Sequence, residues 1–204
     1  MTKDLFIESV ASLVVKYGKE YNLKATSAII AQACLESGFG TSILSSRYNN
    51  HFGLKCGSKW SGKSVNLSTR EEYTAGVMTT IKDNFRVYNS FADGVKGYFD
   101  FLQYSRYQNL KGITDGEKYL NTIIADGYAT DKQYVNKCMK IIATYDLTRF
   151  DALSFVPKTY EEYAECAIDC IRGKYGNGIE RSTNVTRAGF RYEKVQKIVN
   201  ALLA

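Results

Sequence analysis

Glu36 is the side chain whose type and position best suit proton transfer. It lies near the end of SAIIAQACLESGFG, residues 27–40, where apolar residues recur at helical spacing and Gly38 ends the pattern. The C-terminal end of a helix disfavours a carboxylate, and the apolar neighbours Leu35 and Phe39 would remove water from it. Both effects raise the pKa, so that Glu36 could stay protonated and donate a proton to a departing oxygen atom. Spacing alone also fits a solvated glutamate at a helix end.

Metal and thiol chemistry have little support in the sequence. The chain has one histidine, His51, and five cysteines, at positions 34, 56, 138, 166 and 170. All but the second cysteine occupy largely apolar positions of expected helices, so we expect reduced thiols in the core. A zinc site would need a paired cysteine motif or more histidines, and a nucleophilic Cys–His pair would need His51. We therefore expect no metal ion and a structural role for His51.

Helices around one small β region must position Glu36. Residues 53–90 are punctuated by glycine and serine and alternate locally in polarity, which predicts short strands and turns. Thr26 or Ser27 can cap the helix that carries Glu36. This order of elements predicts an α+β fold. The helices expected in this part of the chain span residues 4–21, 27–37, 41–47, 91–104, 116–126 and 131–145.

A domain boundary is expected at Pro157, the only proline of the chain. We predict one domain over residues 1–152, a linker over 153–158 and a small domain over 159–204. So short a last segment has a small core, and we expect it to be marginally stable alone or to dock on its neighbour. Its expected helices span residues 160–172, 182–188 and 192–203.

The charge and hydropathy patterns exclude two classes of partner. The formal net charge of +6 is spread evenly, and no run of lysine and arginine marks a nucleic-acid surface, so we expect no nucleic acid. No segment approaches the roughly 20 apolar residues that span a bilayer, so we expect no membrane insertion. Glu8 and Lys16 interrupt the apolar positions at the N-terminus, which is not typical of a signal peptide. We expect synthesis in the cytoplasm without an ordinary export signal.

Several motifs between residues 20 and 150 together resemble glycoside hydrolase family 73, the bacterial and phage endo-β-N-acetylglucosaminidases. In family order they are AQACLESGFG, YNNHFGLK, W-x-G, T-x-E-Y, FRVYNSFADGVKGYFDFL and DGYATDKQYVNK. The resemblance implies a lysozyme-like α+β fold with a helical lobe and a small β lobe. It also implies cleavage of the β-1,4 bond after N-acetylglucosamine in peptidoglycan. No cofactor is implied, because two carboxylates and water complete the chemistry.

The family motifs imply a catalytic pair of carboxylates. Glu36 matches the general acid of the LESGxG motif, and alignment on Tyr73 makes Glu72 the second carboxylate, with Glu71 as the fallback. Successive residues of a strand point to opposite faces, so only one of these two glutamates can face the cleft. If Glu72 activates water, the anomeric centre inverts and the carboxyl groups lie about 6.5–9.5 Å apart. If the substrate's own N-acetyl group attacks, the second carboxylate only orients or stabilises it.

Further positions are carried over to the substrate groove. Asn50 and Phe52 match the segment that lines the cleft, and Tyr128 matches a family tyrosine facing the scissile sugar. Phe52, Tyr88 and Tyr128 could offer flat apolar faces to pyranose rings, although core packing is the ordinary role of an aromatic residue. We interpret Tyr134 as a packing residue.

The C-terminal segment resembles the CW-seven repeat, a three-helix cell-wall-binding module understood to recognise the muropeptide. Shared residues include Gly173, Asn177 and Gly178, and departures include Tyr175 in place of tryptophan. Asn177 and Gly178 would form a tight turn into a helix start, which favours carboxylates. Arg181 can add a bidentate contact to such a carboxylate. The alternative is that Arg181 only stabilises the small fold.

Together these patterns predict a peptidoglycan glucosaminidase of the phage or prophage endolysin type, acting as a monomer. The lack of a signal peptide would fit release to the wall through a holin-made hole. A muramidase or a lytic transglycosylase on the same polymer is the first alternative. A non-catalytic wall-binding protein is the second.

Overall fold

The computed structural model describes residues 1–74, 77–151 and 158–204, with side chains outside the description at 69–81, 186 and 187. The chain folds as two compact units, Met1–Ala152 and Leu153–Ala204. Most of the predicted linker, residues 153–158, lies outside the described residues. Within the described residues, no helix has both the length and the apolar character needed to cross a membrane.

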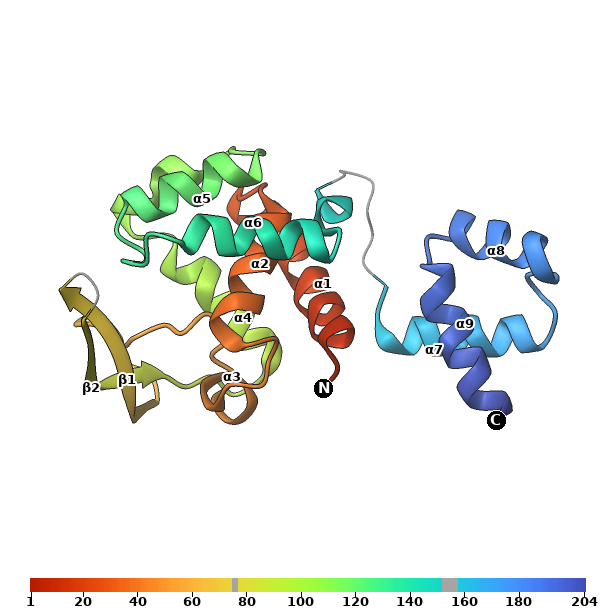
Figure 1. Ribbon diagram of the computed structural model, residues 1–204, viewed down its shortest axis with the longest axis horizontal. Helices are drawn as coiled ribbons and strands as arrows, with labels where there is room; N and C mark the ends of the chain where they lie inside the picture. Colours follow the sequence, from red (N-terminus) through yellow and green to blue (C-terminus); the bar gives the residue numbers. More distant parts are fainter. Residues whose placement is uncertain (75–76, 152–157) are drawn as a thin grey trace. The chain divides into compact units, whose positions relative to one another are not determined.

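The first unit is built around helix α2 (Thr26–Ser37), which is buried on almost every side. Four elements of this unit pack against it, and Figure 1 shows it in orange among the other helices. A helix that is apolar and small-residued all round is typical of a core position, because every face must contact a neighbour. The elements packed on α2 are α1 (Lys3–Tyr21), α5 (Gly116–Ala125), α6 (Tyr134–Thr144) and the 3-10 helix η2 (Leu147–Phe150).

The two ends of α2 are held in different ways. Neither Thr26 nor Ser27 caps the N-terminus, so that prediction is wrong: the Ser27 N–H donates to Oδ1 of Asp151 at 2.8 Å. The start of α2 is buried, and one of its backbone donors is met by a residue 124 positions away. At the other end Gly38 adopts φ 56°, and its N–H donates to the carbonyls of Cys34 and Leu35. Glu36 therefore lies in the last turn, as predicted.

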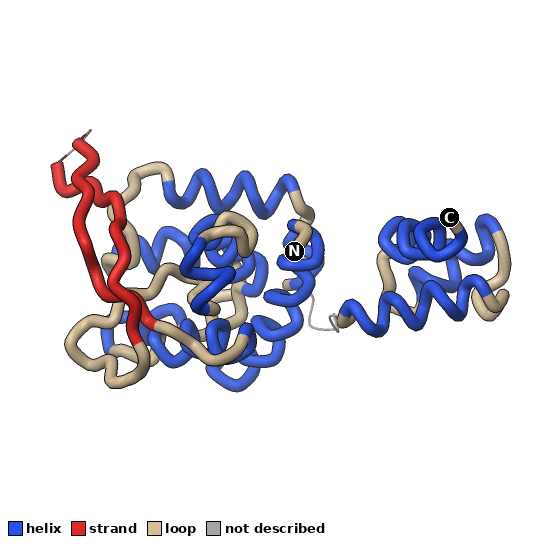
Figure 2. Tube along the Cα trace, turned by 90° about the horizontal axis from the view of Figure 1, so that it is seen from below, coloured by secondary structure: helices blue, strands red, loops and turns tan. Residues whose placement is uncertain are grey.

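The β region is one hairpin rather than several short strands. Strands β1 (Ser64–Thr74) and β2 (Val77–Arg86) pair antiparallel, with Ser64 opposite Arg86 at the base. Figure 2 shows this hairpin in red, extending beyond the helices of the unit. The loop that precedes β1 is joined to the base of the hairpin by an isolated β-bridge between Lys55 and Phe85. Helix α3 (Ile43–Tyr48) precedes the loop, and α4 (Phe91–Phe101) and the 3-10 helix η1 (Ser105–Leu110) follow the hairpin.

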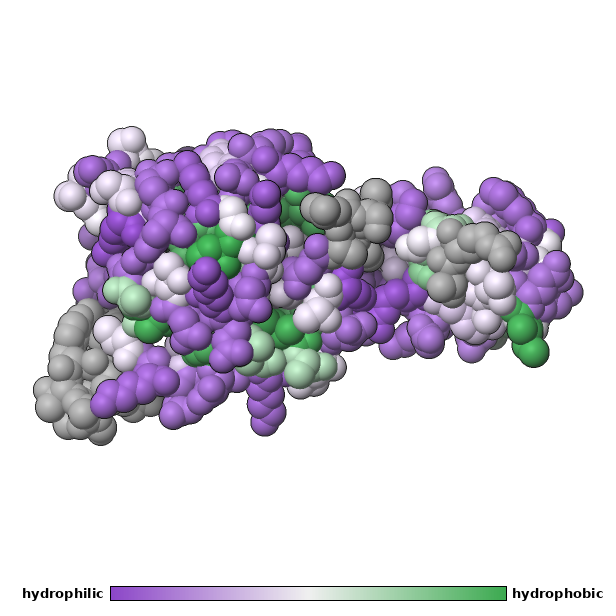
Figure 3. Space-filling view, turned by 90° about the horizontal axis from the view of Figure 1, so that it is seen from above, coloured by the Kyte–Doolittle hydropathy of each residue, from purple (hydrophilic) through white to green (hydrophobic). Residues whose placement is uncertain are grey.

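The second unit consists of three helices around a small core. They are α7 (Tyr160–Ile171), α8 (Gly178–Arg187) and α9 (Tyr192–Leu203). Helix α8 begins four residues before the predicted 182, because the turn at Gly178 leads directly into it. Figure 3 shows one face of the molecule, which is mostly hydrophilic with hydrophobic residues in small patches. The core consists of Tyr163, Cys166, Ala167, Cys170, Val185, Val195 and Val199.

Candidate active site

Glu36 lies half-buried at the wall of a cleft in the first unit. Its Oε1 accepts a hydrogen bond of 2.8 Å from the hydroxyl of Tyr134, the first residue of α6. Its Oε2 lies towards Gly53, where an added Cβ would stand 3.4 Å from that oxygen. The segment after α3 therefore passes close to the carboxyl group, and Gly53 with φ 64° is the residue that permits this turn.

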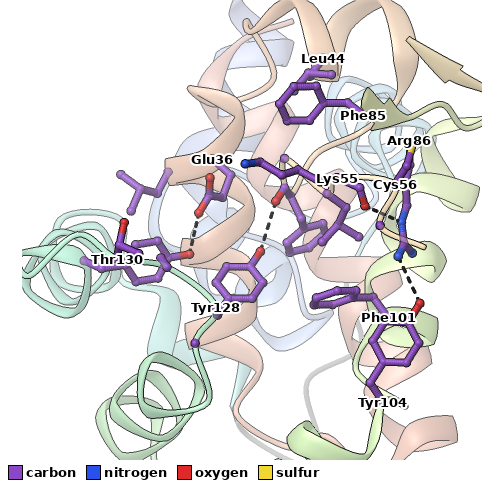
Figure 4. A pocket seen from close by; sticks show the side chains of 18 of the residues that line it. Glu36, Leu44, Lys55, Cys56, Phe85, Arg86, Phe101, Tyr104, Tyr128 and Thr130 are labelled. Carbon is purple, nitrogen blue, oxygen red and sulfur yellow. Dashed lines mark hydrogen bonds between the residues drawn. The ribbon is translucent and has the colours of Figure 1, made fainter. Parts of the chain in front are cut away.

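The cleft has a volume of about 1480 Å³. Small-molecule sites usually measure about 300–1,000 Å³, so this cleft has room for an extended chain. Figure 4 shows Glu36 on one side of Tyr128, and Phe101 with Tyr104 on the other. The walls come from α2, the loop of residues 52–59, the base of the hairpin, the α4–η1 region and residues 127–131.

Tyr128 lines the cleft. That it faces the scissile sugar stays a prediction. Its hydroxyl donates to the carbonyl oxygen of Phe52 at 3.2 Å. Its ring lies edge-on to Phe101 with centroids 6.3 Å apart. Burial, with a smaller contribution from the charge of Glu36, raises the pKa of Tyr128 well above its ordinary value. Tyr128 is therefore a neutral hydrogen-bonding group across the physiological range.

Arg86 supports the far part of the cleft. The residue is 4 % exposed, and its Nε donates to the carbonyl of Lys55 at 3.0 Å. Its guanidinium lies 4.8 Å from the ring centroid of Trp60 and 5.3 Å from that of Phe101. A buried cation needs such partners, and these contacts hold the aromatic side chains of the cleft in place. Phe101 and Tyr104 stand edge to face, with centroids 5.4 Å apart.

The burial of Asn50 and Tyr88 contradicts the prediction that they contact the sugar. Asn50 is 1 % exposed, and its amide bonds the backbone of Leu54 and Arg86 at 2.9 to 3.0 Å. Tyr88 packs against Gly97 of α4, where an added Cβ would come within 2.3 Å of its ring. Neither residue lines the cleft. Asn50 instead joins the Phe52 turn to strand β2, and Tyr88 joins the hairpin to α4.

Phe52 borders the cleft, but its ring belongs to the core. The ring stacks on Tyr98 with centroids 3.9 Å apart and planes 12° apart. Phe52 is only 2 % exposed, which leaves little of its face for a pyranose ring. His51 is likewise buried: its Nδ1 lies 2.6 Å from the hydroxyl of Ser45, and burial lowers its pKa to about 4. His51 thus has the structural role predicted for it.

Tyr134 makes a contact with Glu36 that the sequence did not predict. It is 4 % exposed, in agreement with a packing role, yet its hydroxyl contacts both Glu36 and Gln32. Tyr134 and Glu36, which are hydrogen-bonded to each other, are 98 positions apart in the sequence. The only signal in the sequence is the position of Tyr134 in DGYATDKQYVNK, six residues after Tyr128.

Both candidates for the second carboxylate, Glu71 and Glu72, belong to strand β1. The backbone register pairs Glu71 with Thr79 and Glu72 with Met78. The side chains of both glutamates lie outside the described residues, so the choice between them stays a prediction.

In the second unit, Arg181 holds a turn of its own fold. Its Nε donates to the carbonyl of Gly176 at 3.1 Å, and its Nη2 donates to Oδ1 of Asn177 at 2.9 Å. Gly178 starts α8 with φ 54°, the tight turn that was predicted. These contacts are those of the stabilising alternative, and recognition of a ligand carboxylate by Arg181 stays a prediction.

Comparisons with known proteins agree with this architecture. The family described as mannosyl-glycoprotein endo-beta-N-acetylglucosaminidase matches residues 11–147, and the CW_7 repeat matches residues 164–203. The catalytic domain of the autolysin Auto from Listeria monocytogenes superposes with a TM-score of 0.61 at 29 % identity, covering 72 % of this chain and 86 % of that one.

Two curated relatives extend the comparison. The exo-glucosaminidase LytG of Bacillus subtilis is 30 % identical over 206 residues, which cover 97 % of this chain and 72 % of LytG. The peptidoglycan hydrolase FlgJ of Pseudomonas aeruginosa is 35 % identical over 144 residues. These cover 68 % of this chain but only 36 % of FlgJ, so the chain spans about a third of that relative's length. The family and the lysozyme-like α+β fold predicted from the motifs are confirmed, and the chain belongs to the glucosaminidase family of glycoside hydrolases.

Proposed function

We propose that this protein hydrolyses the β-1,4 bond between N-acetylglucosamine and N-acetylmuramic acid in bacterial peptidoglycan. The observation that carries the proposal is the Glu36 carboxyl group at the wall of a long cleft, with Oε1 bound by Tyr134 and Oε2 beside Gly53. A half-buried carboxyl group held in one orientation suits a general acid. The names of the relatives, a peptidoglycan hydrolase, an exo-glucosaminidase and an autolysin, support the same substrate.

Glu36 acts as the general acid. Its proton passes to the glycosidic oxygen while the bond from that oxygen to C1 of N-acetylglucosamine breaks. The oxygen leaves as the 4-hydroxyl of N-acetylmuramic acid. C1 then takes the oxygen of a water molecule whose proton goes to Glu72, or first takes the carbonyl oxygen of its own N-acetyl group and water follows. Glu71 replaces Glu72 in either route if it is the glutamate that faces the cleft.

Aromatic side chains bind the sugar rings along the cleft. Tyr128, Phe101 and Tyr104 are each half-buried and line it, so they combine a fixed orientation with an available apolar face. Of the three aromatic residues predicted for this role, Tyr128 keeps it, and Phe101 and Tyr104 replace Phe52 and Tyr88. Since the ring of Tyr128 lies 6.0 Å from that of Tyr134, which bonds Glu36, Tyr128 contacts the sugar next to the scissile bond.

The second unit keeps the enzyme on the cell wall. Its match to the CW_7 repeat and its separate core support this assignment. The turn at Asn177 and Gly178, held by Arg181, is the surface we assign to the muropeptide. We further propose that the protein acts as a monomeric endolysin, which reaches the wall after release from the cytoplasm and needs no nucleic acid.

The product ends test the reaction. Purified peptidoglycan is digested with the full chain, reduced with borohydride and analysed by mass spectrometry, with the Glu36→Gln variant as the matched control. We expect reduced N-acetylglucosamine from the wild type alone. Reduced muramic acid would identify a muramidase, and anhydro-muramic acid would identify a lytic transglycosylase. If the wild type binds the wall but creates no new ends, the proposed function is wrong.

A further inference from the structure

A buried chain of hydrogen bonds runs from the core to Glu36. Gln32 of α2 lies at its centre and is fully buried. The hydroxyl of Tyr98 donates to Gln32 Oε1 at 2.7 Å, and Gln32 Nε2 donates to the hydroxyl of Tyr134 at 3.3 Å. Tyr134 then donates to Glu36 Oε1 at 2.8 Å. At the other end, the hydroxyls of Tyr98 and Tyr119 lie 3.0 Å apart.

The distances give the chain a direction. A separation of 2.7 Å is typical of O–H···O, and the longer 3.3 Å suits N–H···O, so the Gln32 amide presents its oxygen to Tyr98 and its nitrogen to Tyr134. Each tyrosine hydroxyl has a single proton. Because Tyr134 accepts from the Gln32 amide, its own proton is directed to Glu36. Tyr98 likewise donates to Gln32, so Tyr119 must be the donor to Tyr98.

We propose that this chain determines which oxygen of Glu36 carries the acidic proton. Tyr134 holds Oε1 as an acceptor, so the proton of the neutral carboxyl group resides on Oε2, the oxygen beside Gly53. A proton on Oε1 would point at Tyr134 and turn that hydroxyl's proton towards the Gln32 amide. Two donors would then face each other in a buried place. Gln32, Tyr98 and Tyr134 are therefore positioning residues, and this inference rests on the proposed role of Glu36 as proton donor.

The chain also affects the acidity of Glu36. A hydrogen bond from Tyr134 stabilises the carboxylate that remains after proton transfer, and its loss would raise the pKa of Glu36. Titratable groups whose pKa responds to the charge of Glu36 include Tyr128, Tyr134 and Cys138. Burial is the main cause that raises the pKa of each, with the Glu36 charge as a further cause, and that of Cys138 reaches about 12. All three stay neutral while Glu36 titrates.

The pH dependence of kcat/KM on peptidoglycan tests the proposal in Tyr134→Phe and Tyr98→Phe. The alkaline limb reports the ionisation of the general acid. We expect Tyr134→Phe to move this limb upwards by about one pH unit and to lower kcat by about tenfold. Tyr98→Phe should shift the limb in the same direction by less, because the Gln32 amide becomes able to turn. Tyr119→Phe is the matched control: it removes a buried hydroxyl, but Tyr98 still donates to Gln32, so the limb should stay in place.

If the tyrosines have a purely structural role, all three variants have a lower thermal unfolding midpoint, and their alkaline limbs lie at the same pH as that of the wild type. This result would overturn the proposal. An infrared measurement tests the proposal even if the tyrosine variants do not fold. The difference spectrum between the wild type and Glu36→Gln at acid pH isolates the C=O stretch of the neutral carboxyl group. We expect the low frequency of a carbonyl that accepts a hydrogen bond; the frequency of an unbonded carbonyl would refute the assignment. If the wild type cleaves no glycan, the proposed function fails, and the infrared result still decides the proton's position.

Discussion

His51 makes the stability of the first unit depend on pH. It is 1 % exposed, its ring packs against those of Phe6 and Phe91, and burial lowers its pKa from 6.5 to about 4. The folded protein therefore binds fewer protons than the unfolded chain below pH 6.5. Stability is full above that value and is lost as the pH falls towards 4. With these two pKa values, the loss between pH 7 and pH 4.5 is about 2.5 kcal/mol.

Urea denaturation at pH 7 and at pH 4.5 measures this loss. Trp60 is the only tryptophan and lies in the first unit, so its fluorescence follows that unit. The wild type is compared with His51→Gln, which cannot titrate, and the difference between the two pH-dependent losses isolates His51. The carboxyls of Asp83 and Asp131 have lowered pKa values, so their contributions are lost only below this window. If both proteins lose the same free energy, the reasoning from burial is refuted.

Substitutions at three further positions test contacts outside the proton chain. Asp151→Ala removes the acceptor of the Ser27 N–H and should destabilise the first unit by about 1 kcal/mol in urea denaturation, while Asp151→Asn keeps an acceptor and should cost less. Gly94→Ala would place Cβ 1.8 Å from the carbonyl oxygen of Asn49, so we expect a loss of about 3 kcal/mol by the same assay. Arg181→Ala should lower the melting temperature of the second unit, measured by calorimetry, because the carbonyl of Gly176 loses its donor; an unchanged transition would contradict the stabilising role of Arg181.

The sequence alone determined the local features of the site. Helical spacing followed by Gly38 placed Glu36 in the last turn of a helix, and α2 ends there because glycine adopts φ 56° without a steric penalty. The change of pattern after Pro157 indicated a second unit of three helices. These features depend on backbone preferences and on apolar periodicity, which operate over a few neighbouring residues.

Only the tertiary structure decided which side chains meet. The partner of Tyr134 is 98 positions away and that of Ser27 is 124 positions away, and no local pattern specifies such pairs. Burial also separated residues of one motif: in YNNHFGLK, Gly53 lines the cleft, whereas Asn50 is closed off by its own hydrogen bonds. Close packing sorts neighbours in a motif into core and cleft, because each helix and turn must satisfy its buried polar groups wherever the fold brings donors and acceptors together.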